Sequence, residues 1–253
     1  MSRIAAVFHE GMKVYLDDSR TFMVLAPLFL AVLVATILPQ ADAFQSVTAV
    51  YAGFPILYTL AAFAGVVSVA GYGNPGRFES RIIKDREWLE ATGVSPAELF
   101  IGRTLSMLVH TLMIAILLCL PLVVSSAAAG LSPAGMGRYL GLLGLWLIAF
   151  RLYGFGIGVL TPRYPLLGQG LASGGALVGL IALSIWLPLT SPVTTVLYQV
   201  VGAAGWTDLI PMDADSGLAV STVTALAFIL AGMAGYTIRL VLMARASRSR
   251  EAV

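Results

Sequence analysis

The chain has 253 residues, of which 58% are hydrophobic and only 11% are charged, whereas soluble domains average about 25% charged residues. This composition indicates a membrane protein. The net charge of +2 says little about partners, and we expect no nucleic acid among them. The single cysteine, Cys119, excludes a disulfide within one chain, and with two histidines the sequence offers no plausible zinc site.

Residues 1–20 are expected to form an amphipathic helix. Ile4, Phe8, Gly11 and Tyr15 share one face at helical spacing, and charged side chains lie opposite. This pattern favours a helix that lies in the membrane interface rather than one that crosses the bilayer. No secretory signal peptide is expected, because charged residues interrupt these first positions and the first long apolar run begins only after them.

The rest of the chain contains apolar stretches close to the roughly 20 residues that cross a bilayer. We place six spans, at 22–39, 48–71, 99–127, 139–161, 166–189 and 217–241. The predicted fold class is therefore an all-α membrane protein, in which residues 1–253 form a single transmembrane domain of six helices. The domain also has an N-terminal interfacial helix and a helix in the loop after the second span.

That loop, residues 72–98, is a strongly charged island between the second and third spans. Phe78, Ile82 and Leu89 lie on one stripe at helical spacing, which predicts a short amphipathic helix that ends near Gly93. Residues 95–98 (Ser-Pro-Ala-Glu) have the pattern of a capping box with proline at the first helical position. A new helix should therefore begin near Pro96 and continue into the third span.

Positive charge predicts the orientation of the spans. With six spans, nearly all Lys and Arg residues outside the bilayer fall on one side, and only Arg138 falls in a loop on the other. Positively charged loops stay in the cytoplasm. We therefore expect both termini and the loop 72–98 to be cytoplasmic. The outer segment 190–216 begins too apolar for a freely solvated loop, and we interpret it as a partly re-entrant element or as a helix packed outside the membrane.

Two residues within the expected spans could carry chemistry. Arg151 lies near the middle of the fourth span, where an arginine is costly and should face protein or a water-filled cavity. It could bind an anionic substrate or headgroup, or it could be satisfied by helix carbonyls or an outer aspartate. His110, in the inner half of the third span, could line the same cavity, although a lone histidine is more often a packing residue.

Several catalytic and energy-coupling motifs are missing from the sequence. Neither lysine, Lys13 nor Lys84, follows a glycine, which excludes a phosphate-binding loop of the G-x-x-x-x-G-K-[ST] type. There is no G-x-S-x-G nucleophile motif and no pair of intramembrane carboxylates. We therefore expect no enzyme in this chain, and uphill transport would need energy from a partner.

The sequence resembles the permease subunits of type-2 ABC exporters, the ABC-2 family. The resemblance rests on an interfacial first helix, six spans, a cytoplasmic loop after span two and a partly re-entrant segment before span six. Locally it rests on Glu87-Trp88-Leu89-Glu90-Ala91-Thr92-Gly93-Val94-Ser95-Pro96-Ala97-Glu98-Leu99 followed by Gly102-Arg103. Family members typically carry an acidic helix, a "TPVS" turn and "ELLLGK", so Gly93 and Arg103 are departures from that pattern.

The resemblance implies a mechanism and partners. The helix near 79–92 would be a coupling helix, with Ile82, Trp88, Leu89 and Glu90 contacting a separate ATPase that carries ATP and Mg²⁺. Two ATPase copies and a second permease chain, identical or homologous, would complete the assembly in a bacterial or archaeal cell membrane, in contact with lipid. This chain itself would hold no cofactor.

Two alternatives of other classes stay open. One is an intramembrane enzyme, which would need a polar cluster within the spans. The other is a non-transporting assembly or immunity protein that only binds a partner in the membrane.

Overall fold

The computed structural model describes residues 2–16, 47–72, 93–128, 131–160, 164–200 and 214–251. The regular elements in these ranges are all helices. In chain order they are α1 (Arg3–Leu16), α3 (Val47–Tyr72), α5 (Pro96–Ala128), α6 (Pro133–Leu160), α7 (Pro165–Trp186), the 3-10 helix η3 (Pro188–Thr190), α8 (Pro192–Val200) and α9 (Ala214–Glu251).

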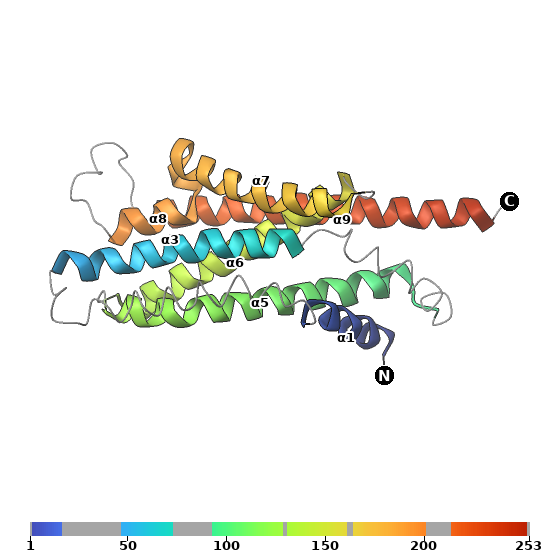
Figure 1. The fold of residues 1–253 in the computed structure, drawn as a ribbon, viewed down its shortest axis with the longest axis horizontal. Helices are drawn as coiled ribbons and strands as arrows, with labels where there is room; N and C mark the ends of the chain where they lie inside the picture. Colours follow the sequence, from blue (N-terminus) through green and yellow to red (C-terminus); the bar gives the residue numbers. More distant parts are fainter. Residues whose placement is uncertain are drawn as a thin grey trace.

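The five long helices α3, α5, α6, α7 and α9 lie side by side and alternate in direction along the chain (Figure 1). Each is long and apolar enough to cross a membrane, which indicates a multi-pass membrane protein. The apolar window of α3 has the largest share of buried residues of the five, and those of α7 and α9 have the smallest. The described residues therefore form an all-helical bundle in which α6 contacts each of the other four long helices.

The expected spans agree with these helices in all but their ends. The predictions at 48–71, 99–127, 166–189 and 217–241 correspond to α3, α5, α7 and α9. Helix α6 begins at Pro133 rather than near residue 139, and α9 continues past 241 to Glu251. The first expected span, 22–39, lies outside the described residues, so a six-span fold stays a prediction.

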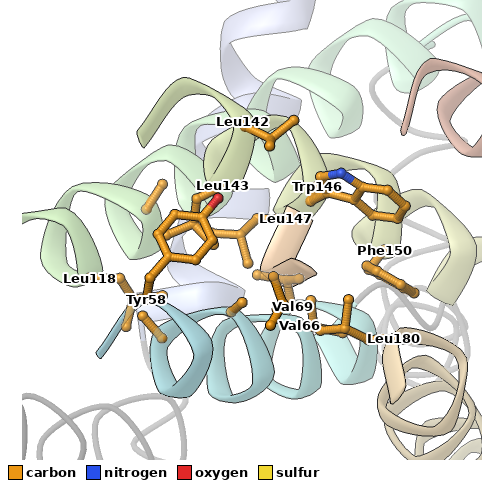
Figure 2. Packing of buried hydrophobic residues seen from close by; sticks show 14 of the residues in the cluster. Tyr58, Val66, Val69, Leu118, Leu142, Leu143, Trp146, Leu147, Phe150 and Leu180 are labelled. Atoms are coloured by element: carbon orange, nitrogen blue, oxygen red, sulfur yellow. The ribbon is translucent and has the colours of Figure 1, made fainter. Parts of the chain in front are cut away.

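A core of large apolar side chains joins α3 to α6 (Figure 2). Trp146, Leu143 and Leu147 on α6 are fully buried against Val66 and Val69 on α3. Because tightly packed interiors tolerate little change in volume, this contact fixes how α3 and α6 lie against each other. The remaining core side chains come from α5, α7, α8 and α9; those on α5 and α7 that Figure 2 labels are Leu118 and Leu180.

Helix starts in this chain repeatedly use a serine followed by proline. The pattern is Ser95-Pro96 before α5, Ser132-Pro133 before α6 and Ser191-Pro192 before α8. Each serine hydroxyl accepts a hydrogen bond from an amide of the first turn, at distances of 3.2 Å in all three cases. The second case explains the early start of α6, since Ser132 is an N-cap that precedes the apolar run.

Both described ends of the chain lie at the same end of the bundle. There, α1, the start of α5 and the last turns of α9 extend past the end of α3 (Figure 1). Helix α5 has 33 residues, or about 50 Å at 1.5 Å per residue, whereas the hydrocarbon core is about 30 Å thick. A projecting first part of α5 therefore fits outside the hydrocarbon, where α1 packs beside it.

Candidate functional site

The four residues expected to contact an ATPase, Ile82, Trp88, Leu89 and Glu90, lie outside the described residues. What the structure describes is the point where their loop rejoins the bundle. Gly93 has a φ of +62°, which is the left-handed conformation that glycine adopts at a helix C-terminus without steric cost. A glycine here in place of the proline usual in the ABC-2 pattern therefore has a conformational reason.

The predicted capping box at residues 95–98 is confirmed. The Glu98 amide donates to Ser95 Oγ at 3.2 Å, and the Ser95 amide donates to Glu98 Oε2 at 2.8 Å. The two bonds satisfy two amides that a helix start would otherwise leave without an intrahelical acceptor. Two residues before Ser95, the Gly93 carbonyl accepts a hydrogen bond from Arg3 on α1 at 2.8 Å. The loop therefore joins both α5 and the first residues of α1 through a fixed turn.

Helix α1 lies along the first part of α5 and runs in the same direction (Figure 1). The facing pairs, each four residues on from the last, are Val7 with Gly102, Gly11 with Ser106, and Tyr15 with His110. A Cβ atom added at Gly11 would lie 2.9 Å from Ser106 Cβ, and one added at Gly102 would lie 2.7 Å from Val7 Cβ. The two helices can therefore approach closely because each contributes a glycine at one contact, Gly11 on α1 and Gly102 on α5. Of the amphipathic helix predicted at residues 1–20, the structure describes α1, Arg3–Leu16, with its buried positions at Val7, Gly11 and Tyr15. Its place in the membrane interface stays a prediction.

Arg151 and His110, predicted as possible cavity residues, are brought together with Tyr15. Arg151 is 0% exposed, His110 is 3% exposed and Tyr15 is 2% exposed. Arg151 Nη1 lies 3.2 Å from His110 Nδ1, and the Arg151 guanidinium carbon lies 4.7 Å from the centroid of the Tyr15 ring. The Tyr15 and His110 rings are stacked, with centroids 4.5 Å apart and planes 9° apart.

The chemistry of this cluster follows from its donors and acceptors. An arginine side chain can only donate hydrogen bonds, so the His110 Nδ1 atom that faces it must accept. His110 is therefore a neutral ring with its proton on Nε2. The Tyr15 ring presents its face to a guanidinium within the 6 Å range of a cation–π contact. The cluster joins α1, α5 and α6, and this arrangement suits positioning of the three helices.

A second buried arginine, Arg103, lies one turn before Met107 on α5. It is 9% exposed and lies beside Tyr236 of α9. The Tyr236 ring stacks on Phe155 of α6, with centroids 4.7 Å apart, and on Phe100 of α5, with centroids 5.3 Å apart. From its position shortly after the charged loop, Arg103 would be expected to face water as a cytoplasmic cation, whereas the structure buries it in an aromatic contact between α5, α6 and α9.

At the opposite end of the bundle, the chain reverses direction between α7 and α8. Trp146 Nε1 donates to Ser221 Oγ at 3.0 Å, and the Ser221 hydroxyl donates to the Thr190 carbonyl in η3 at 3.0 Å. Ser221 lies within the apolar stretch Asp215–Ile238 of α9. Non-helical backbone is tolerated at membrane depth only where protein satisfies its polar groups. This hydrogen-bond chain satisfies a carbonyl of the turn at such a position.

Side chains on both sides of the turn satisfy more of its backbone. The Ser184 and Ser191 hydroxyls lie 2.8 Å apart, and the Val193 amide donates to Ser191 Oγ. Thr190 Oγ1 donates to the Leu187 carbonyl at 2.7 Å. Helix α8 has nine residues, about 14 Å at 1.5 Å per residue, and is therefore too short to cross a bilayer. The part of segment 190–216 that is described packs on α3 and α9 through α8, and its re-entrant character stays a prediction.

Sequence reasoning found two members of the buried cluster and missed Tyr15 and Arg103. The signal for Tyr15 was its four-residue spacing from Gly11 and Val7, matched by Gly102, Ser106 and His110 on α5. For a metal ion, the described part of the chain contains no group of three or more His, Cys, Asp or Glu residues that could hold one.

Comparisons with known proteins leave the family unassigned. No protein-family model matches the chain, and no curated protein matches it either.

Proposed function

We propose that this chain is the membrane-spanning permease subunit of an ATP-driven exporter of the type-2 ABC kind, which moves a substrate outward with a separate ATPase subunit. The observation that carries the proposal is the rigid junction at residues 93–98. A charged loop rejoins the bundle there through a left-handed glycine and a reciprocal capping box, directly at the start of a long apolar helix.

The arrangement of the ends supports this function. The described N-terminus, the C-terminal turns of α9, and the end of α3 and start of α5 that flank the charged loop all lie at one end of the bundle (Figure 1). That is the placement that a cytoplasmic face with both termini and the coupling loop would have. The end of α1 and the start of α3 lie at opposite ends, which fits one more span between them.

The turn at η3 and α8 supports an exit gate at the other end. Backbone groups of the turn are satisfied by the side chains of Ser221, Ser191 and Thr190. In the proposed mechanism, ATP-driven closure of two ATPases pushes on the coupling helix near 79–92. The capped start of α5 then tilts the spans, and substrate leaves between two permease chains past this turn.

The first test is a mild-detergent pull-down of the chain from its native membrane, with mass spectrometry of the recovered proteins. A stoichiometric ATPase that carries a phosphate-binding loop supports the proposal, and a second permease sequence would identify a heteromeric pair. Recovery of the chain alone, after cross-linking through the charged loop, would refute the exporter and favour an intramembrane enzyme. Recovery of a stoichiometric partner without a phosphate-binding loop would refute it in favour of an assembly or immunity protein.

The second test is Leu89→Asp in the purified complex. A carboxylate in an apolar docking groove is costly to bury, so we expect transport-linked ATPase activity to be lost while the chain still inserts in the membrane. Leu89→Met, which keeps an apolar side chain of similar volume, is the matched control and should retain activity. Unchanged activity in the aspartate variant would contradict the assignment of this helix.

A further inference from the structure

Helix α1 is attached to the rest of the molecule at both of its ends. At its start, Arg3 donates to the Gly93 carbonyl, where the charged loop ends. At its end, the Tyr15 ring lies against His110 of α5 and under the guanidinium of Arg151 on α6. The two attachments belong to different parts of the molecule. The first is at Gly93, the loop exit, and the second is within the long helices α5 and α6.

Between these attachments α1 cannot slide on α5. Gly11 and Gly102 leave no space for a side chain at their contacts with Ser106 and Val7, and the Ile4 carbonyl oxygen would lie 3.1 Å from a Cβ at Gly102. Helix α1 and the first turns of α5 therefore form one rigid unit. A displacement of the loop exit moves this unit as a whole, and Tyr15 moves with it.

Tyr15 is where α1 reaches α6. Its ring lies 4.7 Å from the Arg151 guanidinium carbon, and Arg151 is fully buried in the middle of α6. The next residue of α6, Leu152, packs closely on Gly232 of α9, where a Cβ would lie 2.7 Å from the Leu152 carbonyl carbon. The contact chain therefore continues from α1 through α6 into α9.

We propose that Tyr15 is a positioning residue through which α1 relays movement of the charged loop to α6 and α9. This inference rests on the proposed function, in which the loop is pushed by an ATPase. In it, α1 is a strap along the projecting start of α5, fixed to the loop exit by Arg3 and to α6 by the contact of Tyr15 with Arg151. Loss of the Tyr15 ring separates the two ends of the relay while the other contacts of α1 with α5 remain.

The docking part of the proposal is tested on the chain alone. In a Cys119→Ser background, Val7→Cys places a single, smaller side chain on α1 at its contact with Gly102 of α5. The rate at which a methanethiosulfonate reagent labels this cysteine reports how often α1 separates from α5. We expect Tyr15→Leu to raise this labelling rate about thirtyfold, the factor that corresponds to loss of one desolvated cation–π contact. Tyr15→Phe keeps the ring and should leave the rate unchanged.

Arg151→Gln should raise the same rate from the α6 side. The double variant should label no faster than Tyr15→Leu alone, because the contact of Arg151 with the Tyr15 ring is already lost in Tyr15→Leu. Cysteine at Glu10, which is exposed on α1, is the matched control and should label rapidly in every background. Tyr164→Leu, a change at an exposed tyrosine just before α7, should have no effect. Unchanged labelling in Tyr15→Leu, or fully additive effects, would overturn the docking role.

The relay part is tested in the complex with its ATPase, by comparing labelling with and without ATP plus vanadate. In separate single-cysteine variants, Val7→Cys reports α1 and Leu152→Cys reports the contact of α6 with α9. We expect nucleotide to change both rates when Tyr15 is present, and to change only the Val7→Cys rate in Tyr15→Leu. A nucleotide response at Leu152→Cys that survives in Tyr15→Leu would refute the relay, since a merely structural Tyr15 leaves that response intact. Failure to recover an ATPase would refute the proposed function instead, while the docking test on the chain alone would still stand.

Discussion

The contact of α1 with α5 makes a sharp prediction for Gly102→Ala. The added Cβ would lie 2.7 Å from Val7 Cβ and Cγ1 and 3.1 Å from the Ile4 carbonyl oxygen. Carbon atoms in favourable contact are about 3.5–4.0 Å apart, so the two helices must separate by roughly 1 Å. Val7 cannot yield by rotation alone, because its own Cβ is one of the atoms that clash.

The magnitude follows from overpacking and from the contacts that are lost. Overpacking of a well-packed site typically costs about 1–3 kcal/mol, and a gap of about 0.5–1 Å forfeits a quarter to a half of each remaining dispersion contact. The Tyr15 stack on His110 is part of the same helix pair and weakens with it. We expect Gly102→Ala to destabilise the protein by about 1–3 kcal/mol, which lowers the melting temperature by about 2–4 °C per kcal/mol in a chain of this size.

The assay is thermal unfolding of the purified chain in detergent, with Gly141→Ala as the matched control. Gly141 lies within α6 with nothing within 4 Å of an added Cβ. Alanine is the better helix former by up to about 1 kcal/mol, so this control should be neutral or slightly stabilising. If Gly102→Ala melted at or above the temperature of Gly141→Ala, the close packing of α1 on α5 would be wrong.

The remaining predictions concern the two ends of the bundle. Ser221→Ala leaves the buried Trp146 indole N–H without an acceptor, which should cost about 1–3 kcal/mol in thermal unfolding. The control is Thr224→Ala, which removes a hydroxyl that bonds only within α9 and should cost little. Equal melting temperatures of Ser221→Ala and Thr224→Ala would contradict the role of Ser221. Glu98→Ala should destabilise the first turn of α5 by about 1 kcal/mol, which would be measured as faster hydrogen exchange of the Ser95 amide. Glu98→Gln can still complete a capping box, so the Ser95 amide should exchange as slowly as in the unchanged protein.

Local patterns predicted the helices well because each depends on few neighbours. Apolar length alone placed α3 and α7 to within a few residues at most ends, since hydrocarbon thickness sets how long a span must be. The capping box at residues 95–98 was readable because its two bonds join residues three positions apart. The same reasoning, applied to Ser132 and Pro133, would have given the start of α6 as well.

The buried cluster was only partly predictable because it depends on contacts between distant segments. The depth of Arg151 marked it as a residue that needs partners, and the sequence did not say which helix supplies them. Two of its partners are Tyr15 and His110, which precede Arg151 by 136 and 41 positions in the numbering. Charge near a span end usually faces water, so the sequence does not indicate that Arg103 is buried beside Tyr236 of a distant helix.

The energetics of Arg151 explain why α1 can act as a movable strap. An arginine at the centre of a span costs about 2.5–3.5 kcal/mol on insertion scales. A desolvated cation–π contact contributes about 2 kcal/mol, and a hydrogen bond from a charged group about 1.5–3 kcal/mol, so Tyr15 and His110 together supply an amount of the same size. Because Tyr15 is the part of this compensation that α1 supplies, movement of α1 away from α6 removes the contact of the Tyr15 ring with Arg151. The contact of Tyr15 with Arg151 therefore favours the docked position of α1 by only a modest free energy. A force transmitted through the charged loop could overcome it and shift α1 without unfolding the bundle.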